Sequence, residues 1–300
     1  MERSDDNPSA VASAPALPER RGKWIEGLTP STPALDAAGA VLRLRFEDAV
    51  AWRDAAVRDD LTAEQSVTTI HQLRVATRRA SAAIRSFRSI LDEGDARNAS
   101  RRLRRIRRAA GDARDADVQS EAFAELADEG CALGVGYLIS ALARARRSAS
   151  SRVQKRLQSK DGDGLSQVSE RLLDRIKKGD DARGGVLLDL ARRTVRDLTE
   201  SARITARSDL HHLPNCHALR IDGKRLRYAM EVFACCFESG AIDDGVYQQI
   251  TALQDRLGAL NDLHERRLRL GSLRAEGPIG SLPVGVRRAL EASFDALDAR

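Results

Sequence analysis

Apolar residues recur every three or four positions along most of this 300-residue chain, which is the period of an amphipathic α-helix. Runs with this period cover about 33–58, 64–91, 95–109, 113–128, 132–158, 165–178, 183–208, 215–238, 242–275 and 284–299. No stretch alternates apolar and polar side chains as a strand with one buried face would. The pattern therefore predicts an all-α protein.

Short segments rich in glycine, proline and aspartate interrupt this pattern. The breaks fall at Asp92–Asp95, Asp161–Gly164, Gly179–Gly185, His211–Asn215 and Gly277–Pro283. Thr32 and Pro33 predict the start of the first long helix, with the threonine hydroxyl as its cap and proline at the first helical position.

The first 32 residues differ from the rest and are expected to form a disordered tail. Five of the eight prolines lie within the first 33 residues, among Ser, Ala and Asp: Pro8, Pro15, Pro18, Pro30 and Pro33. The first nine residues are polar and acidic, unlike a signal peptide, and no run of about 18 apolar residues occurs. We therefore expect a soluble, cytoplasmic protein.

A basic pattern occurs twice in the chain. It reads His71, Arg74, Arg78 and Arg79 in the first copy and His217, Arg220, Lys224 and Arg225 in the second, an offset of 217 − 71 = 146 residues. A second motif, Gly111–Asp115, recurs as Gly258–Asp262 at 258 − 111 = 147 residues. Two motifs repeated at nearly the same offset indicate an internal duplication.

On a helix, each copy of the basic pattern forms a cationic stripe. His71, Arg74, Arg78 and Arg85 share one face of the first copy, and His217, Arg220, Lys224 and Arg227 share the equivalent face of the second. No carboxylate lies between His71 and Arg88 to relieve the repulsion between like charges four residues apart. A single copy could be a solvated face beside a core histidine, but the duplication favours a binding role.

A third basic segment lies between these copies. Its two faces are cationic at Arg101, Arg104, Arg105 and Arg108 and apolar at Leu103, Ile106 and Ala110. The guanidinium group offers a rigid fork of donors suited to two oxygens of one phosphate. The formal charge is only +6, from 50 basic and 44 acidic residues, yet a polyanion responds to local clustering. Several such faces turned toward one another would bind an extended polyanion.

Together these motifs resemble the CHAD domain (conserved histidine α-helical domain) family. The matching stretches, in the family's order, are HQLRVATRR at 71–79, RRLRRIRRAAGDARDADV at 101–118, HALRIDGKRLRYAMEVF at 217–233 and LQDRLGALNDLH at 253–264. The resemblance covers roughly residues 33–300. It implies two pseudo-symmetric four-helix bundles with a basic cavity between them. The Gly-rich breaks then divide the chain into a first repeat at 33–178 and a second at 179–300.

The resemblance also implies a ligand, inorganic polyphosphate, and a location that includes polyphosphate granules. Carried over position by position, the implied ligands are His71, Arg74, Arg78, Arg79, Arg101, Arg104, Arg105, Arg108, His217, Arg220, Lys224, Arg225, Arg227 and Tyr228. The family often has a further arginine where this chain has Ser81. Binding in the first half would then be weaker or would depend on Arg85, which we include in the expected site, or on Arg88.

Two other functions compete with polyphosphate binding. Asp112, Asp115 and Asp117 with a histidine could form a metal-dependent phosphohydrolase site, but carboxylates at a helix start that orient arginines explain them better. A nucleic-acid backbone binder fits the isoelectric point of 9.4, whereas the aromatic content of 4% is too sparse for a base-stacking platform. We expect a non-enzymatic binder with no catalytic residue, metal or cofactor.

Three smaller expectations follow from single residues. A protonated His71 or His217 among arginines would need an anion beside it, so binding should strengthen at lower pH; a histidine that donates to a backbone carbonyl is the alternative. Gly223, inside a predicted helix, suggests close approach of another helix or of the ligand. The four cysteines lack CxxC spacing and are expected to be buried and reduced: Cys131, Cys216, Cys235 and Cys236.

Overall fold

The structure is a computed structural model that describes residues 16–127, 132–158, 160–179, 185–237, 245–276 and 288. Within these ranges the regular elements are α1 (Ala34–Ala56), α2 (Ala63–Ser86), α3 (Glu93–Ala109), α4 (Gly111–Ala127), α5 (Ala132–Leu157), α6 (Lys160–Lys177), α7 (Leu187–Ala206), α8 (Leu213–Val232), the 3-10 helix η2 (Ala234–Cys236) and α10 (Val246–Glu276). The described part of the chain contains no strand, which confirms the predicted all-α class. The run predicted at 284–299 lies outside the described residues apart from residue 288.

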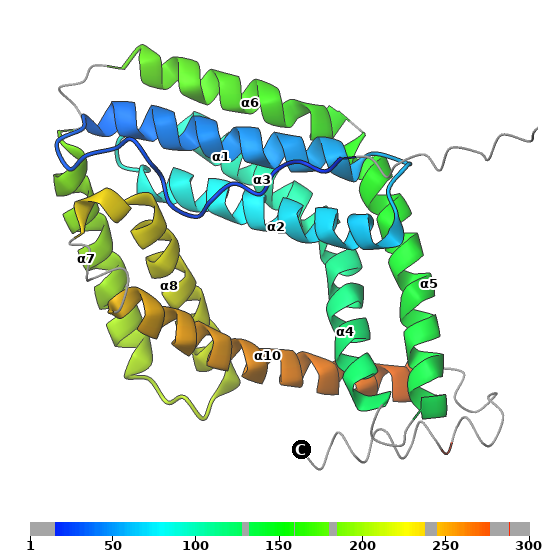
Figure 1. Cartoon of the computed structure of the whole chain (residues 1–300). Coiled ribbons are helices and arrows are strands. Elements are labelled where there is room, and N and C mark those ends of the chain that lie inside the picture. The colour runs from blue at the N-terminus through cyan, green and yellow to red at the C-terminus, as the bar shows by residue number, and fades with distance from the viewer. Residues whose placement is uncertain are drawn as a thin grey trace, which may run out of the picture.

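The helices form three groups (Figure 1). Helices α1, α2, α3 and α6 pack into a layer, and α4 and α5 run side by side away from one end of that layer (Figure 1). At the other end α7 pairs with α8, and α8 also packs against α2 and α10. No helix in the described ranges is long and apolar enough to cross a membrane.

The main hydrophobic core joins the helix layer to the α7–α8 pair, and a smaller cluster forms around Leu226, Met230 and Tyr247. Its largest fully buried side chains include Phe46, Trp52, Phe87, Leu103 and Phe233. Phe87 follows α2 and Phe233 follows α8, and their rings meet edge to face with centroids 5.7 Å apart. Such pairs contribute about 1 kcal/mol beyond the area they bury. The ends of α2 and α8 are therefore fixed against each other.

The starts of α1 and α7 are also tied together. Pro33 and Val186 form an isolated antiparallel bridge, in which the amide of Ala34 donates to the carbonyl of Gly185 (2.9 Å) and the amide of Leu187 donates to that of Thr32 (2.9 Å). The expected Thr32 cap is not formed: Pro33 is the cap position, and the hydroxyl of Thr32 accepts from the amide of Thr29 (2.9 Å). A distant carbonyl satisfies the free amide of α1 and takes over the role of the side-chain cap.

The sequence predicts a disordered tail over residues 1–32, but the structure shows residues 16–32 packed against the helices. Residues 1–15 lie outside the described part of the chain. The segment at 16–32 crosses α1, where the guanidinium of the buried Arg45 donates to the carbonyls of Gly22 (2.9 Å) and Lys23. Trp24 then packs against Tyr247 of α10 with ring centroids 4.9 Å apart. Composition alone misses this because the segment is held by partners far away in sequence.

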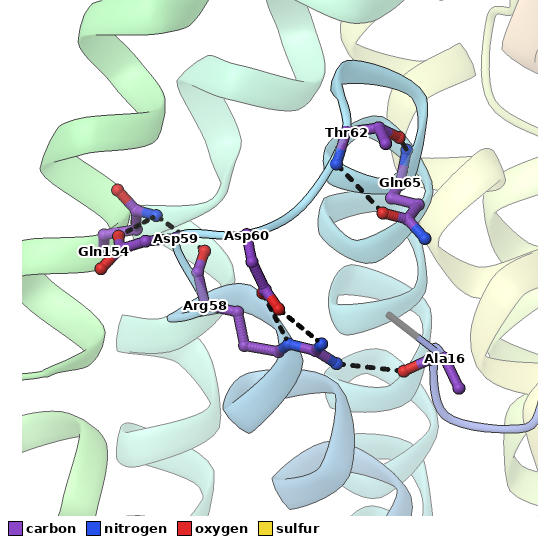
Figure 2. A network of polar contacts seen from close by, with 7 residues as sticks. All are labelled: Ala16, Arg58, Asp59, Asp60, Thr62, Gln65 and Gln154. Atoms are coloured by element: carbon purple, nitrogen blue, oxygen red, sulfur yellow. Dashed lines mark hydrogen bonds and ion pairs between the residues drawn. The ribbon is translucent and has the colours of Figure 1, made fainter. Parts of the chain in front are cut away.

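A network of polar contacts holds the connection between α1 and α2 (Figure 2). Thr62 and Gln65 form a reciprocal capping box at the start of α2, with bonds of 3.0 and 3.1 Å. Arg58 donates to both oxygens of Asp60 (3.0 Å each) and to the carbonyl of Ala16 (3.0 Å). These contacts fix where α2 begins, and therefore the direction of its basic face.

Candidate functional site

Helices α2 and α8 carry the two copies of the basic pattern, and they pack against each other. Leu73, Ala76 and Ala80 are buried on α2, and Leu219 and Leu226 are buried on α8. These apolar positions anchor each helix in the interior. The basic positions between them are consequently held half-buried or at the surface, where an anion can reach them.

In the first half, Arg74 lies beside the second motif. Its Nη1 donates to the carbonyl of Arg107 (3.1 Å), and a methyl group added at Gly111 would lie 3.5 Å from the same nitrogen. Burial lowers the pKa of Arg74; Asp115 opposes this shift, and Arg78 adds to it. The Arg74 guanidinium therefore lies directly beside the start of α4.

The second half repeats this arrangement. A methyl group added at Gly258 would lie 3.8 Å from Nε of Arg220, as Gly111 lies beside Arg74. His217 pairs through Nδ1 with Oδ1 of Asn261 (3.2 Å), so the exposed imidazole is held by a side chain rather than a backbone carbonyl. The two motifs that the sequence repeats are therefore in contact with each other in both halves.

Cations from both copies of the basic pattern act on Lys224. This half-buried lysine of α8 has its pKa lowered to about 8, first by burial, then by Arg220 of its own helix and by Arg78 of α2. Asp262 of α10 acts in the opposite direction but has the smallest effect of those named. Similarly, Arg85 of α2 lies within the field of Arg225 of α8. The structure thus brings α2 and α8 together at their charged faces.

Arg107 belongs to the same cationic cluster, although the helical pattern did not select it as a ligand. Burial lowers its pKa to about 10, and the next largest effects all come from other arginines: Arg85, Arg78, Arg74 and Arg104. Arg74, Arg104, Arg107 and Arg108 line one cavity of about 530 Å³ together with Gly111. Arg107 projects from the border between the apolar and exposed faces of α3, where periodicity gives no signal.

Ser81 explains how Arg107 fits. Ser81 is buried, and its hydroxyl donates to the carbonyl of Thr77 (2.7 Å), while Nη1 of Arg107 lies 3.5 Å from that hydroxyl oxygen. The short side chain at the position where the family often has arginine therefore faces a guanidinium supplied by α3. Arg88, which we considered as a substitute, is exposed and pairs with Glu93 (3.2 Å).

Two of the expected ligands, Arg79 and Arg227, flank a buried carboxylate and do not line the cavity. Glu231 is 2% exposed, with Arg79 at 3.7 Å and Arg227 at 4.0 Å. The hydroxyl of Tyr247 donates to Glu231 (3.1 Å), and burial, followed by Glu231, raises the pKa of Tyr247 to about 12. Tyr228 is itself buried, with the Arg227 guanidinium 4.9 Å from its ring centroid.

The remaining expected ligands lie at the edge of the cluster. Arg101 and Arg105 are exposed on α3 and do not line the 530 Å³ cavity. Arg225 is exposed and pairs with Asp222 (3.1 Å). His71 is half-buried, and burial, then Arg114 and Arg78, lower its pKa, which favours the neutral imidazole.

The three aspartates of α4 point to different partners. Asp112 pairs with Arg152 (3.4 Å), and Asp117 pairs with Arg146 (2.9 Å), both across to α5. Burial raises the pKa of Asp115, which Arg74 opposes. Over the residues that the structure describes, no three side chains of the His, Cys, Asp or Glu type gather as metal ligands.

The cysteines take no part in this site. Cys216, Cys235 and Cys236 are free thiols and half-buried rather than fully buried, and Cys131 lies outside the described residues.

The fold and the site define an all-α protein in which arginines of α2 and α3 line one cavity, close to further basic residues of α2 and α8. Over residues 40–271 the sequence matches the CHAD domain family, and the chain belongs to that family. The match covers most of the helices described above, including all four motifs.

Two solved structures share the fold. The CHAD domain from the plant Ricinus communis superposes with a TM-score of 0.74 at 21% identity, over 91% of this chain and 88% of that one. PptA from Streptomyces chartreusis superposes with a TM-score of 0.64 at 16% identity, over 89% of this chain and 94% of that one. No curated protein matches the chain.

Proposed function

We propose that the protein binds inorganic polyphosphate without transforming it. The observation that carries this proposal is the gathering of basic side chains from α2, α3 and α8, in which burial and then neighbouring arginines lower the pKa values of Arg107 and Lys224. Mutual repulsion of this kind raises the energy of the empty protein. A bound polyanion would remove it, so part of the binding energy comes from relieving repulsion.

The shape of the cluster favours a long anion over a single phosphate. Arg74, Arg104, Arg107 and Arg108 line the 530 Å³ cavity, and Arg78, which also acts on Arg107, links this cavity to Lys224 on α8. Guanidinium groups stay charged at physiological pH and bind phosphate oxygens in pairs. We infer that the chain of phosphates runs from the α3 side of this cluster toward α8.

We further propose that the two halves are duplicated four-helix bundles, divided near Gly179. The repeated contacts Arg74–Gly111 and Arg220–Gly258 support this, as do the linked starts of α1 and α7. In this interpretation the shared anion site lies where the two bundles meet. Binding to polyphosphate would also place the protein on polyphosphate granules where these occur.

Titration with polyphosphate of defined lengths, with free phosphate measured in parallel, tests the proposal. Arg78→Glu combined with Arg107→Glu should abolish binding, because each reversal adds repulsion inside the cluster. The matched control reverses two exposed arginines of α7, Arg193→Glu with Arg196→Glu, and should bind normally. Equal binding by both double variants would contradict the site, and steady release of phosphate would show an enzyme.

The alternative ligand is a nucleic-acid backbone, which offers the same phosphate chemistry. Competition separates the two at equal phosphate concentration. Long polyphosphate should displace RNA from the protein, and RNA should fail to displace polyphosphate. The opposite result would make the protein a nucleic-acid binder.

A further inference from the structure

A second cavity, of about 230 Å³, lies between the start of α8 and the middle of α10. Its apolar walls are Leu213 and Pro214 of α8 and Leu257 and Leu260 of α10. Leu213 is 45% exposed and Leu260 is 51% exposed, so the cavity opens to solvent between apolar side chains. Pockets for a whole drug-sized ligand have about 300–1,000 Å³. This cavity therefore has room for part of a ligand, such as one ring system.

Polar side chains at the same cavity can hydrogen-bond the edge of a ring. Nδ1 of His217 pairs with Oδ1 of Asn261 (3.2 Å), and both residues line the cavity together with His264. Because an amide oxygen only accepts, Nδ1 of His217 donates in this bond. Nε2 of the neutral ring then accepts, and the amide nitrogen of Asn261 donates. A donor and an acceptor side by side match the edge of a nucleobase.

The cavity adjoins the α8 end of the proposed anion site. Arg220 lies one turn beyond His217 on α8, and its Nε would lie 3.8 Å from a methyl group added at Gly258. Gly258 directly follows Leu257, which lines the cavity. The carboxylate in the lining, Glu265, lies two turns from Gly258 along α10, at the opposite end of the cavity. A ligand whose anionic end binds Arg220 would thus place its uncharged end between the apolar walls.

The two copies of the repeat differ at this place. At the offset of 147 residues, Asn261 corresponds to Arg114 (261 − 147 = 114) and His264 corresponds to Asp117 (264 − 147 = 117). Asp117 pairs with Arg146 of α5 (2.9 Å), so the first copy uses this position for an ion pair within the chain. The second copy has side chains that line an open cavity instead. Binding of phosphate would be common to both halves, whereas recognition of an uncharged group belongs to the second.

We propose that the protein binds nucleoside triphosphates here, with the base in the 230 Å³ cavity and the phosphates at Arg220, an inference that rests on the proposed anion site. The base lies between the leucines and bonds His217 and Asn261. The triphosphate has the same phosphoanhydride chain as polyphosphate, so the basic residues of α8 bind it in the same way. A bound nucleotide would therefore exclude polyphosphate from the α8 part of the site, and nucleotide concentration would regulate how much polyphosphate the protein holds.

Calorimetric titration of the full chain in magnesium-free buffer tests this inference. The probes are ATP, GTP, CTP and UTP, compared with inorganic tripolyphosphate, which has three phosphates and no nucleoside. At least one nucleotide should bind about tenfold tighter than tripolyphosphate, because its base buries apolar surface in the cavity. Long polyphosphate in excess should displace that nucleotide.

Two cavity variants locate the nucleoside. Leu260→Ser removes an exposed apolar wall, and Asn261→Arg installs the residue type of the first copy. In both, the ratio of nucleotide affinity to tripolyphosphate affinity should fall toward one, while Leu260→Ser should bind tripolyphosphate normally. Leu253→Ser is the matched control, because Leu253 is 40% exposed on α10 and lies outside the cavity lining that the structure describes. A preference that persists in both cavity variants would place the nucleoside elsewhere and overturn the inference.

The outcomes separate this inference from the proposed function. If all four nucleotides bind no tighter than tripolyphosphate, the nucleotide site is refuted, and the proposed function survives provided that long polyphosphate binds. If a nucleotide binds through the cavity while long polyphosphate does not bind, the nucleotide site stands and the proposed function fails.

Discussion

At the scale of single residues, the site consists of basic side chains whose surroundings disfavour the charged form. Burial lowers the pKa values of Arg74, Arg107, Lys224 and His71, and neighbouring arginines lower each of them further. A protein gains no stability from such an arrangement by itself. The arrangement is useful only if an anion supplies the missing negative charge.

Lys224 should make polyphosphate binding depend on pH. Its pKa is about 8 in the free protein, and a bound polyanion raises it toward the ordinary value of about 10.4. The complex therefore takes up a proton, and affinity falls as pH rises from about 8 toward 10.4. Calorimetric titrations in buffers with different ionisation enthalpies measure this uptake. Lys224→Arg should remove this part of the pH dependence, and its persistence in that variant would contradict the assignment.

His71 should act in a lower pH range. Its free pKa lies below the ordinary value of about 6.5, and an anion beside it favours the protonated ring. Affinity should therefore increase further as pH falls from 8 to 6. The same titrations on His71→Gln should lack this increase, while the response assigned to Lys224 remains. A flat affinity between pH 8 and pH 6 in the natural protein would show that neither histidine is protonated on binding.

Lys224 should also lower the stability of the empty protein. A lysine whose folded pKa is below its unfolded pKa destabilises the fold at low pH, and the penalty disappears as pH rises from about 8 to about 10.4. Because Lys224 is partly exposed, we expect Lys224→Met to raise the free energy of unfolding by only about 1 kcal/mol at pH 7. Urea unfolding measures this change. Lys177→Met is the exposed control, and polyphosphate affinity should fall only in Lys224→Met.

At the scale of helices, much of the fold could be predicted from the sequence because the apolar period is strong. The helices expected at 33–58, 95–109 and 132–158 are observed as α1, α3 and α5 with ends that shift by a few residues. Periodicity reports which face of a helix is buried. Periodicity does not report which distant group bonds the free amides at a helix end. The sequence therefore predicts the start of α1 correctly, but not the group that caps it.

The same limit applies to the site. The duplicated motifs placed cations on α2 and α8, since repeat spacing is visible in the sequence. Arg107 was missed because it depends on a small partner, Ser81, on another helix. Arg79 and Arg227 were assigned to the ligand, and nothing in the pattern indicated that Glu231 would lie between them. Tertiary partners decide which basic residues of a helix line a site.

Glu231 should be the main polar link between α2, α8 and α10. Its carboxylate is buried and contacts Arg79, Arg227 and Tyr247, which come from these three helices. Removing one partner of a buried ion pair leaves the other charges uncompensated, so Glu231→Ala should cost about 3 kcal/mol of stability. Thermal and urea unfolding measure the loss. Glu200→Ala, which removes an exposed pair with Arg203, should leave the midpoint unchanged, and equal effects would contradict the assigned role of Glu231.

At the scale of the whole molecule, the net charge of only +6 comes from charges that are unevenly paired. Acidic residues pair with arginines at the outer helices, as in Asp112–Arg152 and Arg203–Glu200, whereas Arg107 and Lys224 face mainly other cations. The core shared through Phe87 and Phe233 holds α2 and α8 together against this repulsion. The energy of this packing thus keeps α2 and α8 together, although repulsion between their cations would drive them apart.

The salt dependence of binding should report this cluster directly. Each phosphate neutralised by the protein releases counterions, so the logarithm of affinity should fall linearly with the logarithm of salt concentration. Arg107→Gln should reduce that slope by about one unit, because it removes one phosphate contact. Arg193→Gln changes the net charge equally but lies exposed on α7, and should leave the slope unchanged. Equal reductions in both variants would mean that polyphosphate responds to net charge, and that no defined cluster binds it.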